Sequence, residues 1–287
     1  MSFSVGVACA FAASALYSAE IAIQAMDARA TPLRHALRPE LLVLLARRPR
    51  WLTASAIGTL GWPLQAAALA LAPLTLVQPA LALGLLVLFP IARRVLRDTF
   101  ATRDLVAAVA IAVGITGIAA TTPARHLQHA APHVTALVLA ALGALALLPY
   151  AARPGVGRAT ARAATVSAGC AFAWSGIATK FFVDAFPSRP ALAGLWLAAT
   201  AVAAGVGVLS EMTALQVVRP TQVAPAVFAV ETLLPVALAP VLVGERWSAS
   251  LPRDLVLAGS IILVVAGAVL LQTSRSLEPL RASASSS

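Results

Sequence analysis

Residues 103–121 read RDLVAAVAIAVGITGIAAT, and residues 253–271 read RDLVLAGSIILVVAGAVLL. The two stretches begin with the same four residues and carry Gly117 and Gly267 at the same distance from that start. After its opening Arg-Asp pair each stretch is predominantly apolar, and it has about the 20 residues that a helix needs to cross a bilayer. The chain therefore contains two similar copies of one predicted membrane span.

The composition extends this conclusion to the whole chain. Of its 287 residues, 60% are hydrophobic and 11% are charged, and the mean hydropathy is +0.88. Because water-soluble proteins carry about 25% charged residues, a soluble fold is excluded and many spans are expected. The sequence contains no Gly-rich phosphate loop, no HExxH and no GxSxG, so we expect neither an enzyme nor a bound cofactor or metal.

Nine apolar runs are long enough to form spanning helices. They lie at 3–26, 51–72, 74–96, 103–121, 133–151, 162–184, 191–215, 220–242 and 253–273. The only long connection contains the segment 32–48, in which a short leucine-rich stretch lies beside arginines. This segment is too short to span, which favours a helix in the membrane interface or the remnant of a shortened span. The predicted fold class is an all-α integral membrane protein.

Arginines are distributed unevenly between the two sides of these spans. The loops after the first, third, fifth and seventh spans, with the C-terminal tail, hold 16 arginines, whereas the opposite side holds four. Cytoplasmic loops are enriched in Lys and Arg, so we expect the N-terminus outside the cell membrane and a disordered cytoplasmic tail at 275–287. This placement also accounts for the net charge of +10 without a nucleic-acid-binding face.

A second pair of segments points to an internal duplication. The Cys-Ala-Phe-Ala that begins at Cys9 in the first span returns at Cys170 in the sixth, and a weaker match relates Pro79 to Pro225. Each match is five spans apart, and because that number is odd, the two copies enter the membrane from opposite faces. Chance similarity in a chain rich in Ala, Leu and Val is the alternative.

The predicted organisation is therefore an inverted repeat. Residues 1–122 form the first repeat of four spans, 133–151 form a linking span, and 160–274 form the second repeat of four spans. Transporters commonly bind their substrate between two such halves.

Several short motifs resemble the drug/metabolite transporter superfamily in its EamA-like form. They are Gly244-Glu245-Arg246-Trp247 before the last span, Gly259 and Gly267 within it, and Trp174-Ser175-Gly176 in the sixth span. Most members have ten spans. The nine-span pattern, with Leu76-Val77-Gln78-Pro79 opening the third span, is closer to the NIPA-type branch, which is associated with magnesium transport. The resemblance covers 3–273 and implies a transporter without identifying its substrate.

Charged side chains within the spans are the first candidates for a site, because each costs about 2.5–3.5 kcal/mol at a helix centre. Glu231 lies at the middle of the eighth span, where a carboxylate can bind a proton or a cation. The alternative is a structural ion pair with Lys180, the only lysine, which can also extend to the headgroups. Glu20 and Glu211 lie at one depth nearer the cytoplasm, where they either attract a cation together or pair with arginines such as Arg219.

Neutral polar and aromatic residues complete the candidate binding set. They are Gln65, Gln78, Tyr17, Trp174 and Ser175. Gln65 occupies the position in the repeat that corresponds to Glu211. Intramembrane glutamines commonly bond only to neighbouring helices, and rings at this depth commonly only pack, although an aromatic face also attracts cations.

These residues predict a secondary transporter that moves a small polar solute or cation by alternating access. A transporter of magnesium or another divalent cation is one alternative. A non-transporting membrane scaffold or accessory subunit, in which buried charges only specify packing, is the other. The expected partners are the transported solute and the lipid bilayer, and the small residues along every span also allow a homodimer.

Overall fold

The computed structural model describes residues 2–72, 77, 80–81, 87–88, 90–91, 94, 102–121, 131–152, 155, 157–243 and 251–272. Within these residues the regular secondary structure is helical and no strand is formed. The helices are α1 (Ser2–Arg29), the 3₁₀ helix η1 (Leu33–His35), α2 (Glu40–Ala46), α3 (Pro49–Leu71), α6 (Thr102–Thr121), α7 (Pro132–Ala152), α8 (Arg158–Ala185), α9 (Pro190–Leu215), α10 (Pro220–Val243) and α11 (Leu251–Gln272).

The long helices coincide with the apolar runs of the sequence. Every predicted span except 74–96 overlaps a helix whose ends lie within a few residues of those expected, and 74–96 falls largely outside the described residues. Within the part of the chain that the structure describes, five helices (α1, α3, α7, α8 and α9) are long and apolar enough to cross a membrane. The chain is thus an α-helical membrane protein, whereas the count of nine spans stays a prediction.

Proline marks the start of four of the long helices. Pro49, Pro132, Pro190 and Pro220 begin α3, α7, α9 and α10. The first helical position suits proline, because its missing N–H would have no partner inside the helix. These prolines separate consecutive apolar runs into distinct helices.

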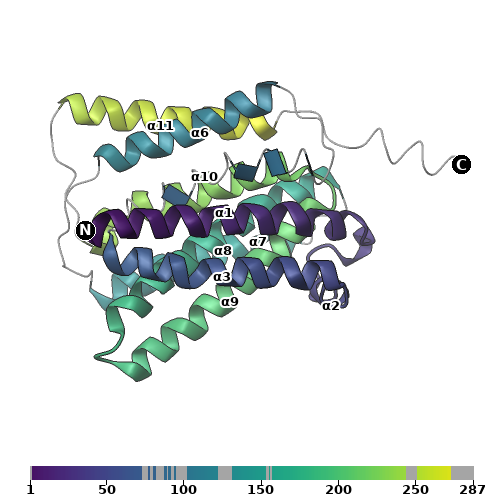
Figure 1. The fold of residues 1–287 in the computed structure, drawn as a ribbon, viewed down its shortest axis with the longest axis horizontal. Coiled ribbons are helices and arrows are strands. Elements are labelled where there is room, and N and C mark those ends of the chain that lie inside the picture. The colour runs from purple at the N-terminus through teal and green to yellow at the C-terminus, as the bar shows by residue number, and fades with distance from the viewer. Residues whose placement is uncertain are drawn as a thin grey trace, which may run out of the picture.

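The long helices pack in pairs. α1 lies against α3, α8 lies against α9, and α6 lies against α11, while α10 joins α8 to the α6–α11 pair (Figure 1). The α6–α11 contact depends on glycine: a Cβ on Gly117 would lie 2.1 Å from the Oγ of Ser260, and one on Gly267 would lie 2.7 Å from the carbonyl oxygen of Ala107. Small residues of this kind allow membrane helices to approach closely.

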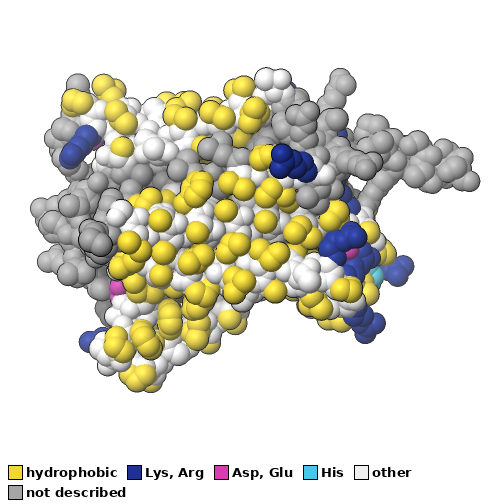
Figure 2. All heavy atoms as spheres, in the orientation of Figure 1, with side chains coloured by type: hydrophobic (Ala, Val, Ile, Leu, Met, Phe, Trp, Pro, Cys, Tyr) yellow, Lys and Arg dark blue, Asp and Glu magenta, His cyan; other side chains and the backbone are white. Residues whose placement is uncertain are grey.

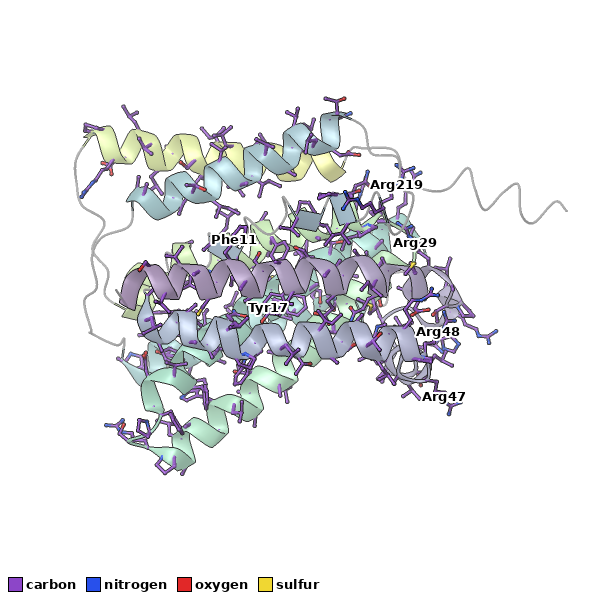
Figure 3. The ribbon with its side chains drawn as sticks, in the orientation of Figure 1. Phe11, Tyr17, Arg29, Arg47, Arg48 and Arg219 are labelled. Atoms are coloured by element: carbon purple, nitrogen blue, oxygen red, sulfur yellow. The ribbon has the colours of Figure 1, made fainter. Side chains whose placement is uncertain are left out.

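The surface separates into an apolar band and a basic end. Hydrophobic side chains cover α1, α3 and α9 on the face shown in Figure 2, and Lys and Arg side chains gather at the end where α2 lies. Arg29, Arg47, Arg48 and Arg219 lie at this end (Figure 3), and the N-terminus lies at the other (Figure 1). The unequal arginine distribution of the sequence therefore appears in space as one basic end of the helix bundle.

The segment between α1 and α3 crosses the basic end and docks on α9. The backbone N–H of Leu37 donates to the Oγ1 of Thr213 at 3.0 Å, and the Nε2 of Gln216 donates to the carbonyl oxygen of Pro32 at 3.1 Å. Leu41, in α2, is fully buried in the core that also contains residues of α9. The leucines expected to lie in the membrane interface are therefore partly buried inside the protein. Residues 31–48 are called the strap below.

Candidate functional site

A cavity of about 410 Å³ lies between α1, α3, α8, α9 and α10. Its volume falls within the range of about 300–1,000 Å³ that is typical of small-molecule pockets. The described lining residues include three carboxylates, Glu20 from α1, Glu211 from α9 and Glu231 from α10. The fold thus brings together three glutamates that are far apart in the sequence.

Glu20 is held in place by its neighbours on α1 and α3. The Nε2 of Gln24, one helical turn away, donates to the Oε1 of Glu20 at 2.8 Å and lies 3.0 Å from the Oγ of Ser55. The other carboxylate oxygen lies over Gly58, where an added Cβ would be only 1.6 Å from it. Glycine at position 58 therefore leaves the space that the carboxylate occupies.

Among the described residues, Glu211 and Glu231 have no such partners. Glu211 is 4% exposed, and its Oε1 accepts no hydrogen bond from the described residues. Within the same part of the chain, Glu231 forms neither a hydrogen bond nor an ion pair that would neutralise it. Glu211 lines the same cavity as Glu20 and Glu231. Buried carboxylates are stable only when they are protonated or paired, so this group is suited to bind a proton or an added cation.

Tyr17 and Gln65 join α1 to α3 beside the carboxylates. The hydroxyl of Tyr17 donates to the Oε1 of Gln65 at 2.7 Å, and the ring lies over Gly61, between the two helices in Figure 3. Ser175 lines the opposite wall, where its hydroxyl donates to the carbonyl oxygen of Thr200 at 3.3 Å. All three predicted residues therefore face the cavity.

Two predicted residues do not line the cavity. The Nε1 of Trp174 donates to the carbonyl oxygen of Leu139 at 2.8 Å, which turns the indole toward α7. The Nζ of Lys180 lies 2.5 Å from Asp184, one turn further along α8, so it does not neutralise Glu231. Gln78 lies outside the described residues, as do Pro79 and the tail at 275–287.

The remaining walls are mainly apolar and aromatic. Residues that the sequence analysis did not select include Gln24, Trp62, Phe172, Thr200 and Phe228. Helical spacing could have identified two of these lining residues, because Gln24 follows Glu20 by one turn and Phe228 precedes Glu231 by one turn. No Lys, Arg or His is among the described lining residues. The cavity is therefore apolar in its walls and acidic in its charge.

Among the described residues, no group of three His, Cys, Asp or Glu side chains is placed to hold a metal ion. The arrangement is chemically suited to a cation whose charge meets the carboxylates and whose body contacts apolar and aromatic walls.

Comparison with known proteins gives no match. No protein-family model matches the chain, and no curated protein or solved structure is significantly similar to it. The functional interpretation therefore depends on the cavity itself.

Proposed function

We propose that the protein is a secondary transporter that carries a small organic cation across the membrane by alternating access. The observation that carries the proposal is the grouping of Glu20, Glu211 and Glu231 in one cavity whose described lining contains no basic residue. An intramembrane carboxylate is costly, and proteins that keep several of them commonly use them to bind protons, ions or charged substrates.

An organic cation fits the walls better than a divalent metal ion does. Magnesium requires near-octahedral oxygen coordination and keeps several of its waters, so its sites are polar. Here Phe172, Val208, Val227 and Phe228 line the cavity beside the glutamates. Magnesium transport of the NIPA type is therefore the second candidate, supported by the sequence motifs rather than by the chemistry of the walls.

The packing of the two helix hairpins supports an inverted repeat. Residues at matching intervals line the cavity from both. They are Gly58, Trp62 and Gln65 on α3, and Ala204, Val208 and Glu211 on α9. Gly61 and Gly207 also match, and each leaves space for an aromatic ring of the preceding long helix, Tyr17 or Phe172. Related halves of opposite orientation are the usual basis of alternating access.

The strap provides the closure that such a mechanism requires at the basic end. Its hydrogen bonds to Thr213 and Gln216 connect the α1–α3 hairpin to the end of α9 that carries Glu211. If the two hairpins rock apart at this end, these bonds must break. We therefore assign the strap to the inner gate, with the basic end cytoplasmic by the positive-inside rule.

The same proposal places the chain among the EamA-like drug/metabolite transporters, with nine spans, in the cell membrane. Its support is the motif Trp174-Ser175-Gly176 and the repeat, together with Gly244-Glu245-Arg246-Trp247, which lies outside the described residues. The proposed function does not require this family assignment, because the acidic cavity alone supports it.

A flux assay in proteoliposomes tests the proposal. Purified protein is reconstituted, and uptake of a panel of monovalent organic cations is compared with uptake of Mg²⁺. We expect saturable uptake of an organic cation that Glu231→Gln abolishes, while Asp254→Asn, which removes an exposed carboxylate at the start of α11, leaves it unchanged. If wild-type protein moves no member of the panel, the scaffold alternative is supported instead.

A further inference from the structure

We infer that the cavity opens sideways, between α3 and α9, into the hydrocarbon core of the bilayer, and that its ligand is an amphipathic organic cation that enters from the lipid. The inference rests on the proposed function for the charge of the ligand. The position of the opening rests on separate observations.

The rim of the cavity is marked by side chains that both line it and are exposed on the protein surface. Among the described lining residues, Thr59 on α3 and Leu197 and Ala201 on α9 have this property, and Leu197 is 42% exposed. On both helices these residues lie between the cavity-facing side and the fully exposed side, which on α9 carries Val202 (71% exposed). The opening therefore lies along the seam between α3 and α9.

This seam opens at the depth of the bilayer centre. Thr59 lies about 15 Å along α3 from Pro49, and Ala201 about 16 Å along α9 from Pro190, at 1.5 Å per residue. The hydrocarbon core is about 30 Å thick, so both residues lie near its middle rather than at either polar surface. An opening at this depth meets lipid chains and not bulk water.

The neighbouring seams are closed by close packing. In the α1–α3 seam the side chains of Glu20 and Tyr17 fill the space over Gly58 and Gly61, and in the α8–α9 seam the ring of Phe172 fills the space over Gly207. By contrast, α3 and α9 make few contacts with each other, and α9 diverges from α3 in Figure 1. The α3–α9 seam is therefore a gap between two described helices that both line the cavity.

The two ends of the cavity are also shielded. Toward the basic end, Gln24 is 2% exposed and Glu211 is 4% exposed. Toward the opposite end, the indole of Trp62 donates to the Oγ1 of Thr179 at 3.4 Å, and its ring centroid lies 5.7 Å from that of Phe182. In this conformation of the protein, the route into the cavity that the described residues leave open is therefore the lateral one, between α3 and α9.

The chemistry along this route selects the ligand class. Ala201, Ala204, Val208 and Glu211 line the cavity from one side of α9 at helical spacing, so a molecule entering at Ala201 meets small and apolar side chains before Glu211. A small hydrophilic cation would have to lose its hydration in the lipid, which is costly. A cation with a large apolar or aromatic body partitions into the bilayer, and its charge meets the carboxylates only at the inner end of the route. The route thus favours a lipophilic cation over a hydrated one.

Collision measurements on a spin label inside the cavity test the opening without any substrate. In a chain with Cys9→Ala and Cys170→Ala, a nitroxide is attached at Ala204→Cys, with Val202→Cys as a lipid-facing control. Oxygen concentrates in the bilayer centre, whereas a charged nickel complex stays in water. We expect collisions with oxygen to dominate the relaxation of the nitroxide at both positions. Adding Ala201→Trp should reduce the oxygen effect at position 204 but not at position 202. Dominance of the nickel complex at 204 would overturn the lateral opening.

Transport of two cations tests the ligand class. Tetraphenylphosphonium partitions into lipid and tetramethylammonium does not. We expect wild-type protein to transport the first, Ala201→Trp to slow it at least about tenfold, equivalent to 1.4 kcal/mol in the barrier, and Val202→Trp to leave it unchanged. Equal transport of both cations by the wild type, or equal slowing of both by Ala201→Trp, contradicts the inference. If neither cation is transported, the proposed function fails, while the spin-label result still decides where the cavity opens.

Discussion

In the α1–α3 hairpin the ring of Tyr17 lies over Gly61, and in the α8–α9 hairpin the ring of Phe172 lies over Gly207. The two hairpins are therefore held together in the same way. Their polar groups differ, however, because α3 presents the neutral Gln65 where α9 presents Glu211. When α1 and α8 are aligned at Cys9 and Cys170, Glu20 corresponds to Phe181. Close packing is thus shared between the hairpins, whereas charge is concentrated on selected helices.

The largest expected effect comes from exchanging the two polar groups that distinguish the hairpins. Glu211→Gln makes α9 resemble α3, and we expect it to weaken cation binding by about 10- to 100-fold, since a hydrogen bond or contact to a charged group is worth roughly 1.5–3 kcal/mol. The measurement is equilibrium binding of the organic cation that the wild type transports.

The reverse change provides the control for this exchange. Gln65→Glu adds a carboxylate to the wall and keeps an acceptor oxygen for the Tyr17 hydroxyl. In the double variant Glu211→Gln/Gln65→Glu we expect at least partial recovery of binding. Binding that is unaffected by Glu211→Gln would mean that this carboxylate does not contact the cation.

The shared packing predicts a smaller effect on stability. Gly207→Ala puts a Cβ 2.6 Å from the ring of Phe172, and Gly61→Ala puts one 2.7 Å from that of Tyr17. Overpacking of this kind costs about 1–3 kcal/mol, so both variants should unfold at lower temperature in detergent.

Gly205 offers the matched control on α9. A Cβ there meets nothing within 4 Å, so Gly205→Ala should stabilise the helix by up to about 1 kcal/mol. A loss of stability in Gly205→Ala equal to that in Gly207→Ala would show that contact with the packed ring does not decide the outcome, because helix propensity alone favours alanine at both positions.

The strap allows the closure at the basic end of the cavity to be tested. Gln216→Leu removes the hydrogen bonds of its amide to the strap, and Thr213→Val removes the acceptor for the N–H of Leu37. Each bond contributes about 0.5–1.5 kcal/mol, so the double variant should open the basic end several-fold more often. The rate at which a hydrophilic maleimide labels Gln24→Cys, in a chain without its two native cysteines, measures this opening. Thr53→Val, which removes an exposed hydroxyl of α3, should not change the labelling rate.

The smallest effect is expected at Lys180. Its partner Asp184 lies one turn away on the same helix, and the two side chains are 19% and 28% exposed. Partly exposed pairs of this kind contribute about 0–1 kcal/mol. Lys180→Met should therefore leave cation binding unchanged and shift thermal unfolding only slightly. Loss of binding in this variant would place Lys180 in the site after all.

The helices could be predicted from the sequence because apolar runs of membrane length are a strong signal. Glu20, Glu211 and Glu231 could be selected as well, since charge in such runs is costly. Which side chains face one cavity could not be predicted, because this depends on the rotation of each helix against its neighbours. Trp174 and Ser175 are adjacent in the sequence, but about 100° apart around the helix, so the serine lines the cavity and the indole bonds to α7.

The pairing of Lys180 shows a different limit of prediction from the sequence. The sequence suggests Glu231 as its partner, because both are charged residues in apolar spans. A local partner was present in the sequence, since Asp184 lies four residues further along the same helix, where oppositely charged side chains meet readily. The local pair forms, and Glu231 is left facing the cavity.

Equilibrium binding of an organic cation to the purified protein decides whether the three carboxylates form a cation site. Isothermal titration with tetraphenylphosphonium is carried out on the wild type, on the triple variant Glu20→Gln/Glu211→Gln/Glu231→Gln and on Asp254→Asn. We expect saturable binding to the wild type and to Asp254→Asn, and none to a folded triple variant. Equal affinity of the triple variant and the wild type would contradict the proposed cation site.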